Sequence, residues 1–355
     1  MRKKIIFLLI TCFTLSNSSA YALILPVETK NYWRAQSYIA NQINGIGLVD
    51  SYQEDNTDQS YVYDNVLSAM ASMSMGNFGV ASEILDTLAF EVQRTPENVL
   101  YESYNYYNYN GSGNGTAYAG NSAWLLQALN IYQKLRGSKT YYALQKQLAD
   151  FLLTLQDPAD GGIRGSTYEY WKSTEHNLMA YAALRNFGRL NSLPNYVTQA
   201  EKVKTFLLSQ AVWNGTYFNR GAWDTKKVVD VQSLAVLLFG PTYAKVLNWA
   251  ELNLKNTKGF YWSAVTGFDF NDDLDTVWIE GTLQAALAFY RTGNTTKSNY
   301  YYNEALKTVQ ADGSLVLATN IGSASESWTL QPWHSIAPTA WLILYYFKFN
   351  PLILY

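Results

Sequence analysis

Residues 259–293, GFYWSAVTGFDFNDDLDTVWIEGTLQAALAFYRTG, contain a set of elements that recurs along the chain. An aromatic loop and an acidic turn lead into a helix that we expect to begin near Glu280 and to end at Gly293. Its apolar face consists of Leu283, Ala286, Leu287 and Tyr290, which follow the spacing i, i+3, i+4, i+7. Unpaired N–H groups and the helix dipole favour a carboxylate in the first turn. Because Glu280 opens onto a loop of Tyr, Trp and Asp, this helix is expected to form one wall of a cleft.

The same arrangement is expected six times. Loop-entered helices are predicted to begin near residues 64, 122, 175, 230, 280 and 338, roughly 50 to 58 residues apart, which is a repeat signature. Each follows a long loop and ends in a short turn, and the helices between them are expected over 27–44, 78–94, 139–156, 195–211, 241–255 and 295–310. Long loops are uncommon in compact domains unless they are functional. Six of them before the same kind of helix therefore predict one functional rim.

The two kinds of helix differ in composition. The loop-entered helices are rich in small and apolar residues, as expected for helices packed on both sides. The alternate helices carry charges, for example Glu201, Lys202 and Lys204, as expected for an outer layer. Twelve helices with hardly any strand pattern predict an all-α fold, with a period too long for open solenoids of about 34 residues per repeat.

This pattern of six helical hairpins resembles the (α/α)6 barrel of the six-hairpin glycosidase-like superfamily. The resemblance covers nearly all of residues 23–355, which we expect to form a single domain. It implies that the long loops form a substrate cleft at the end where the inner helices begin. It also implies action on polysaccharides or oligosaccharides, commonly hydrolysis with inversion. Because the architecture also includes lyases and epimerases, the fold alone does not define the reaction.

Residues 1–22 have the features of a secretory signal peptide. Arg2, Lys3 and Lys4 precede an apolar run, and Ala20-Tyr21-Ala22 forms a cleavage site. A secreted or periplasmic location is therefore expected. Cleavage would remove Cys12, the only cysteine of the chain, so disulfides and thiol chemistry are not expected in the mature protein.

The remaining composition narrows the class of partner. Cleavage removes three of the 26 basic residues and none of the 28 acidic residues, and a mildly acidic chain is a poor nucleic-acid binder. No second apolar run of about 18 residues follows, so no membrane span is expected. Aromatic residues make up 15% of the chain, and they suit both sugar stacking and an ordinary core. We expect a monomer that binds a carbohydrate substrate and needs no cofactor or metal.

Glycoside hydrolysis needs two carboxyl groups across the scissile bond. The starts of the loop-entered helices supply Asp64, Glu175, Asp230 and Glu280. Each has a structural alternative, because acids near a helix N-terminus also satisfy its free N–H groups. Asp230 fits that alternative best, since two valines precede it. Glu175 and Glu280 lie among aromatic residues and are predicted to be catalytic, with Asp64 as the third candidate.

The acidic turn before Glu280 has two interpretations. Its carboxylates would raise the pKa of a neighbouring acid, which favours Glu280 as the proton donor, although the sequence leaves the acid and base roles open. The spacing of Asp269, Asn271, Asp273, Asp275 and Glu280 matches the ligand positions of a calcium loop. A leucine stands where that loop needs glycine, so an acidic loop lining the cleft is expected instead.

Residues in or beside the long loops are predicted to bind the sugar. They are Tyr63, Trp171, His176, Trp223, Trp262, Trp278, Trp333 and His334. His176 and His334 are the only histidines, and both lie at helix entrances. Related barrels use histidines to move protons at sugar carbons, so a polysaccharide lyase or sugar epimerase is the alternative to a glycoside hydrolase. A non-catalytic glycan-binding protein of a polysaccharide export system is a third hypothesis.

Overall fold

The computed structural model describes most of the chain beyond the expected signal peptide. The described residues are 27–56, 58–95, 98–107, 111–112, 116–324 and 328–354. The predicted signal peptide, residues 1–22, lies outside them, so the structure does not bear on it.

Helices dominate the described part of the chain, as the repeat pattern predicts. They are α1 (Val27–Asn41), α2 (Val62–Ser74), α3 (Phe78–Arg94), α4 (Ala119–Arg136), α5 (Tyr142–Thr154), α6 (Thr174–Leu190), α7 (Pro194–Leu207), α8 (Val229–Phe239), α9 (Lys245–Asn253), α10 (Ile279–Arg291), α11 (Thr295–Leu306) and α12 (Ile336–Tyr346). The inner helices begin within three residues of their predicted starts. The helix expected over 241–255 is instead a 3₁₀ turn, η1 (Pro241–Tyr243), followed by the shorter α9.

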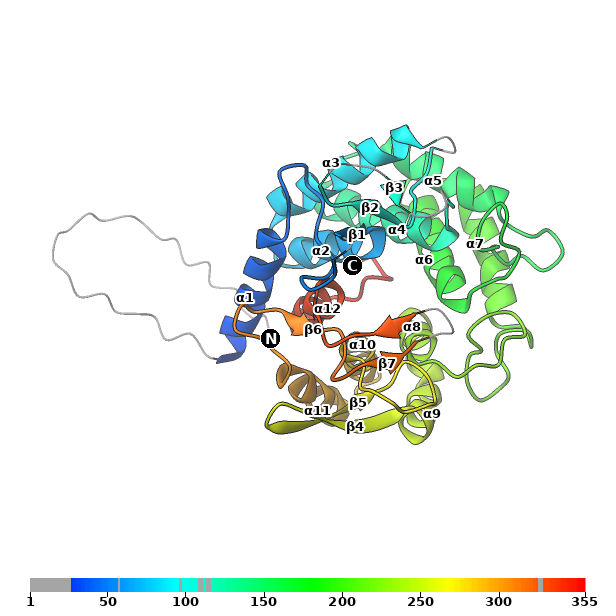
Figure 1. The fold of residues 1–355 in the computed structure, drawn as a ribbon. Coiled ribbons are helices and arrows are strands. Elements are labelled where there is room, and N and C mark those ends of the chain that lie inside the picture. Colours follow the sequence, from blue (N-terminus) through cyan, green and yellow to red (C-terminus); the bar gives the residue numbers. More distant parts are fainter. Residues whose placement is uncertain are drawn as a thin grey trace, which may run out of the picture.

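The helices form two concentric layers (Figure 1). The inner helices α2, α4, α6, α8, α10 and α12 pack side by side in that order, and α12 packs against α2 to close the ring. Helices α3, α5, α7, α9 and α11 each pack outside the inner helix that precedes them. The sixth hairpin joins the two ends of the chain, because α1 packs against α12. This closed ring of six hairpins is the predicted all-α (α/α)6 barrel.

The two layers bury their residues as their compositions predict. In α8, every residue from Val229 to Leu238 is buried, because neighbours lie on all sides. Helix α7 buries one stripe, formed by Tyr196, Ala200, Val203, Phe206 and Leu207. Its charged residues lie on the opposite face, which is the pattern of an outer amphipathic helix.

Short strands occur only in the loops of the described chain. They are β1 (Gln59–Tyr61), β2 (Ser103–Asn105), β3 (Gly111–Ser112), β4 (Lys255–Phe260), β5 (Ser263–Phe268), β6 (Leu315–Val316), β7 (Gly322–Ser323), β8 (Thr329–Leu330) and β9 (His334–Ser335). The sheet orders are β1-β2-β3, β4-β5, β6-β9 and β7-β8, and all pairs are antiparallel. The β4–β5 hairpin, in which Phe260 pairs with Ser263, replaces the loop expected before α10.

None of the helices of the described chain has both the length and the hydropathy that a bilayer-spanning segment requires.

Candidate active site

Four acidic side chains meet at the rim where the inner helices begin. Asp64, Glu175, Asp230 and Glu280 lie in the first turns of α2, α6, α8 and α10. Asp64, Asp230 and Glu280 are buried, and Glu175 is partly buried. Ring closure thus brings together carboxyl groups that are up to 216 positions apart in the sequence.

Helix capping does not account for three of these acids. Helices α2 and α10 have no side-chain cap, and α6 is capped by Ser173, which accepts a hydrogen bond from the backbone N–H of His176. The side-chain partners of Asp64, Glu175 and Glu280 are instead Ser51, Trp124 and Tyr63. Asp230 does accept hydrogen bonds from backbone amides of its own turn, but its Oδ1 is buried without a partner.

Tyr63, on α2, connects Glu280 of α10 with Trp341 of α12, the helix between them in the ring. Its hydroxyl donates to Glu280 Oε1 at 2.5 Å and accepts from Trp341 Nε1 at 3.2 Å. Gln284, one turn further along α10, donates to the same oxygen at 2.9 Å. Because charged acceptors form the stronger hydrogen bonds, these two donors favour the ionised form of Glu280.

Trp124 connects Glu175 to Tyr63 and so to Glu280. Trp124 Nε1 donates to Glu175 Oε1 at 3.3 Å. The Trp124 ring meets the Tyr63 ring edge-on, with centroids 5.0 Å apart. Glu175 and Glu280, from α6 and α10, are thus joined through Trp124 and Tyr63.

Burial raises the pKa values of these carboxyl groups. Burial is the main cause that raises the pKa of Glu280 well above its ordinary value, with further contributions from Asp64, Glu175 and Asp230. Burial likewise raises the pKa of Glu175, and it raises the pKa of Asp64 to about 7. No ion pair of the described residues includes any of the four. Carboxyl groups whose pKa values are raised in this way suit general acid–base chemistry.

His176 lies in the wall of the site against α4. Its ring is so close to Gly120 that a Cβ at residue 120 would lie 2.5 Å from it. Burial lowers the pKa of His176 to about 4, so the imidazole is neutral at pH 7. Its Nδ1 is buried without a hydrogen-bond partner, which leaves this atom for a ligand.

His334 is engaged elsewhere. Its Nδ1 lies 3.0 Å from Asp312 Oδ2, and its Nε2 lies 3.5 Å from Glu54 Oε1. Glu54 also accepts the backbone N–H of His334. His176 and His334 therefore have different surroundings and do not contact the same partners.

Among the predicted aromatic residues, Tyr63 and Trp278 are closest in the chain to the acids. Trp278 immediately precedes α10, is buried, and leaves its Nε1 without a partner. Trp333 is partly buried, and its ring centroid lies 5.9 Å from that of Tyr52.

The remaining predicted tryptophans are exposed to solvent. Trp171 is exposed, packs on Gly221 and lies 5.5 Å from the Arg220 guanidinium. Trp223 is exposed and has a left-handed backbone, with φ of 61°. Trp262 is fully exposed at the tip of the β4–β5 hairpin. Beside it, Ala264 accepts a hydrogen bond from Lys307, just after the outer helix α11.

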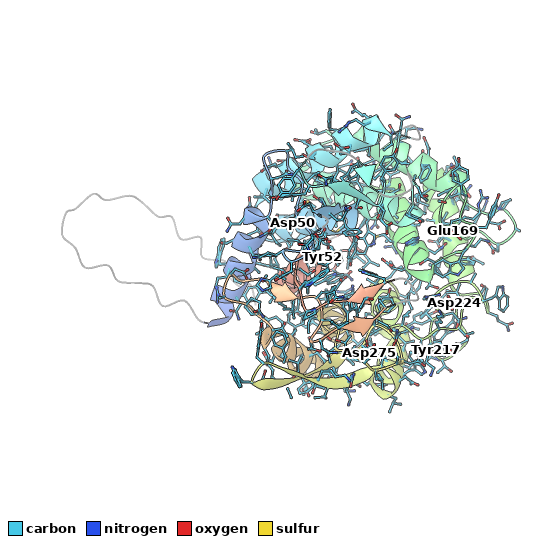
Figure 2. All side chains as sticks on the ribbon, in the orientation of Figure 1. Asp50, Tyr52, Glu169, Tyr217, Asp224 and Asp275 are labelled. Carbon is cyan, nitrogen blue, oxygen red and sulfur yellow. The ribbon has the colours of Figure 1, made fainter. Side chains whose placement is uncertain are left out.

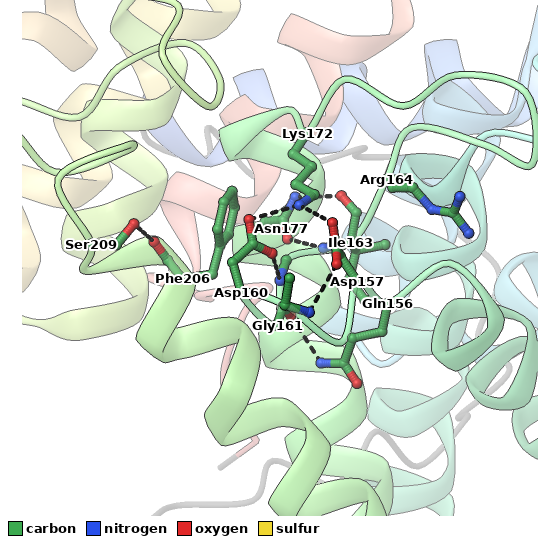
Figure 3. A network of polar contacts seen from close by, with 12 residues as sticks. Gln156, Asp157, Asp160, Gly161, Ile163, Arg164, Lys172, Asn177, Phe206 and Ser209 are labelled. Atoms are coloured by element: carbon green, nitrogen blue, oxygen red, sulfur yellow. Dashed lines mark hydrogen bonds and ion pairs between the residues drawn. The ribbon is translucent and has the colours of Figure 1, made fainter.

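A polar network holds the loop that leads to Glu175 (Figure 3). Lys172 Nζ lies 2.7 Å from both Asp157 and Asp160. Asn177 exchanges hydrogen bonds with the backbone N–H and C=O of Ile163. These contacts tie the two ends of the loop before α6 together and so fix the helix start that carries Glu175.

The acidic turn before α10 is ordered by its own hydrogen bonds. Oxygens of Asp269, Asp273 and Asp275 lie within 4.8 Å of one another, so these three are the described residues that could hold a cation. Asp269 accepts the N–H groups of Phe270 and Thr276, through separate oxygens. Asp273 and Asp275 contact Ser323 and thereby tie the turn to the following loop.

Some of the residues that build this site were missed by sequence reasoning. Trp124 and Trp341 lie in the core, and their indole N–H groups donate to Glu175 and Tyr63. Gln284 follows Glu280 by four residues, and this spacing on one helix face was an available signal.

Comparison with known proteins supports the fold. No family model matches the chain, and no curated protein matches it. Among similar solved structures is a glycosidase variant in complex with glucose, with a TM-score of 0.73 and 11% identity over 92% of this chain and 98% of that chain. Others are a D-mannose isomerase (TM-score 0.68, 10% identity, 93% and 99% coverage) and cellobiose 2-epimerase from Spirochaeta thermophila (0.66, 11%, 92% and 96%). The chain thus has an (α/α)6 barrel fold, as its repeats predict.

Proposed function

We propose that this protein is a carbohydrate-active enzyme, and specifically a glycoside hydrolase. The observation that carries the proposal is the pair Glu175 and Glu280, joined through Trp124 and Tyr63 at the rim where the inner helices begin. One carboxyl would protonate the glycosidic oxygen while the other activates water or attacks the sugar carbon. The raised pKa values favour the protonated form that the general acid must have.

The fold neighbours support a carbohydrate substrate. They include a glycosidase, which has been solved with glutamate replaced by alanine and with tyrosine replaced by phenylalanine. The same residue types meet in this site. A sugar hydroxyl would also suit the partnerless Nδ1 of His176, and His176, Asp64 and Asp230 are proposed to contact the substrate.

Proton transfer at a sugar carbon is the second candidate. The isomerase and epimerase neighbours favour it, as does a neutral imidazole at His176 with its Nδ1 buried and without a partner. His334 is less suited to share this role, because Asp312 and Glu54 hold it.

A product assay of the purified mature protein separates the candidates. Polysaccharides and oligosaccharides would be tested for new reducing ends, for unsaturated-sugar absorbance and for epimerised products. Hydrolysis predicts reducing ends that disappear in Glu175→Gln and Glu280→Gln but persist in Glu201→Gln, an exposed control on α7. Epimerised or unsaturated products that need His176 would replace the proposal, and binding without turnover would indicate a glycan-binding protein.

We also propose that the protein is exported and acts as a monomer. The basic, apolar and small-residue segments of residues 1–22 support export. The N-terminal sequence and mass of the protein from a cell-surface or periplasmic fraction test the location, and sedimentation tests the oligomeric state. A mature chain that still starts at Met1 in the cytoplasm would contradict the export proposal.

A further inference from the structure

Carboxyl groups extend beyond the pair that hydrolysis needs. Next to Glu280 lies Asp64, and Asp50 is close enough to Asp64 to raise its pKa. Burial raises the pKa of Asp50 to about 6, and Asp55, Asp58 and Glu54 contribute further. Figure 2 shows Tyr52 beside α2 and Asp50 a short way further along the same loop, toward α1 and α3. We refer to Glu175, Asp230, Glu280, Asp64 and Asp50 as the acidic track.

Three basic residues of the surrounding loops are bound to other acids. Lys172 pairs with Asp157 and Asp160, Arg220 with Asp224, and Lys227 with Asp272. Arg220 influences Asp230 only at longer range, because its guanidinium lies 2.7 Å from the Asp224 carboxylate. Among the described residues, no ion pair compensates a member of the acidic track.

Two members of the track have buried oxygens that lack a donor. Asp230 is only 8% exposed, and its Oδ1 has no hydrogen-bond partner. Asp50 Oδ1 is also buried and without a partner. A buried acceptor left unpaired is costly, so these atoms indicate a donor that arrives with a ligand.

The pKa of Asp230 is raised to about 7 and that of Asp50 to about 6, chiefly by burial, so part of each carboxyl is ionised at pH 7 and a cationic donor would favour the ionised form. This distinguishes between possible donors. A sugar hydroxyl donates one hydrogen bond and leaves the carboxylate charge uncompensated. A protonated amine offers three donors, and it is attracted strongly in a partly desolvated site. A uronic acid or sulfated sugar would instead be repelled by several carboxylates.

We propose that the glycan bound at the acidic track contains amino sugars with free, protonated amino groups. Asp230 and Asp50 would accept hydrogen bonds from these groups, while Glu175 and Glu280 remain available for the reaction. This inference rests on the proposed function because it names the substrate class of the same site.

The test compares sugars that differ only in charge. Binding of D-glucosamine and D-galactosamine would be measured by ligand-observed NMR at pH 7 and low ionic strength, beside N-acetyl-D-glucosamine, N-acetyl-D-galactosamine, D-glucose and D-galactose. At least one amino sugar is expected to bind 10-fold or more tightly than its acetylated and hydroxyl counterparts, and salt is expected to weaken this preference. If neither amino sugar binds more tightly than its counterparts, the inference is overturned.

Substitutions of single acids test which residue gives the preference for amino sugars. Asp230→Asn is expected to reduce the preference for the amino sugar over its neutral counterparts about 10-fold. Asp160→Asn, which removes an acid outside the track, is expected to change neither. An unchanged preference in Asp230→Asn would overturn the assignment to this residue.

The binding experiments and the product assay together distinguish the failure of this inference from the failure of the proposed function. Amino-sugar binding without any hydrolysis would contradict the proposed reaction and support the ligand class. Hydrolysis of neutral glycans without a preference for amino sugars would do the reverse.

Discussion

Two groups of acidic residues flank the start of α6, and they differ in how their charge is compensated. Asp157 and Asp160 share the ammonium group of Lys172 (Figure 3), and this pairing lowers the pKa of Asp157. Glu280 is buried and Glu175 partly buried, both without a cation, and their pKa values are raised. Paired acids fix a loop, whereas buried acids without a cation destabilise the fold and are retained for another reason. The contrast therefore indicates a structural role for Asp157 and Asp160 and a role in the reaction for Glu175 and Glu280.

The largest expected effect is on the reaction. Glu175→Gln and Glu280→Gln are each expected to reduce kcat by about 10²- to 10⁴-fold, because an amide cannot transfer the proton. Far-UV circular dichroism should match the wild type. Asp160→Asn is the control from the paired group and should retain most of the activity. Normal turnover in either glutamine variant would contradict the assignment.

Tyr63→Phe tests the connection between the two glutamates. Removing the hydroxyl deletes one charge-assisted hydrogen bond to Glu280, for which a loss of roughly 10- to 100-fold in kcat is expected. The Tyr63 hydrogen bond lowers the pKa of Glu280, so its loss should move the limb of the pH–rate profile that reports Glu280 to higher pH. A change in KM alone, with an unmoved profile, would make Tyr63 a substrate contact only.

Lys172→Met tests the paired group. The side chain of Lys172 is only 11% exposed, and its two partners are partly exposed. Loss of its charge-assisted hydrogen bonds should lower the free energy of unfolding by about 1–3 kcal/mol. Lys202→Met, on the exposed face of α7, should change it by less than about 0.5 kcal/mol. Equal effects of the two changes in urea denaturation would remove the distinction between a loop anchor and a surface lysine.

The smallest effect is expected at the edge of the molecule. Trp262 is fully exposed on the hairpin tip, so Trp262→Ala should change the free energy of unfolding by less than about 0.5 kcal/mol. Activity on short oligosaccharides should be unchanged as well, because the hairpin lies beside α11. A loss of activity on short substrates would place Trp262 in the site, as its sequence position predicts.

The repeated fold could be predicted because its signals are local. Small residues in the inner helices, long loops before them and short turns after them are visible within each repeat. The β4–β5 hairpin was missed because its two-residue turn, Tyr261 and Trp262, lacks the glycine or asparagine typical of such turns.

The site was predicted only in part. Glu175 and Glu280 could be selected because a helix start is recognisable in sequence. The contact between Tyr63 and Glu280 spans 217 positions and exists only because α12 closes the ring against α2. For the same reason, sequence could not reveal that His334 lies between Asp312 and Glu54.

The most direct test of the central claim is the pH dependence of unfolding, compared between the wild type and Glu280→Gln. An acid whose pKa is raised in the folded state binds more protons folded than unfolded, so its contribution to stability falls as the pH rises from the unfolded value toward the folded one. Asp157, with a lowered pKa, has the opposite sign, and its contribution is lost as the pH falls below its unfolded value.

Urea denaturation from pH 4 to pH 8 therefore gives a clear expectation. The free energy of unfolding of Glu280→Gln, relative to the wild type, should increase from about pH 4.5 toward neutral pH. The wild type loses the contribution of protonated Glu280 over this range, whereas a glutamine at residue 280 does not titrate. Subtracting the wild type removes the general charge repulsion of an acidic protein. A difference that stays flat or falls with pH would show that Glu280 is not a strained, uncompensated acid, and would contradict the account of this site.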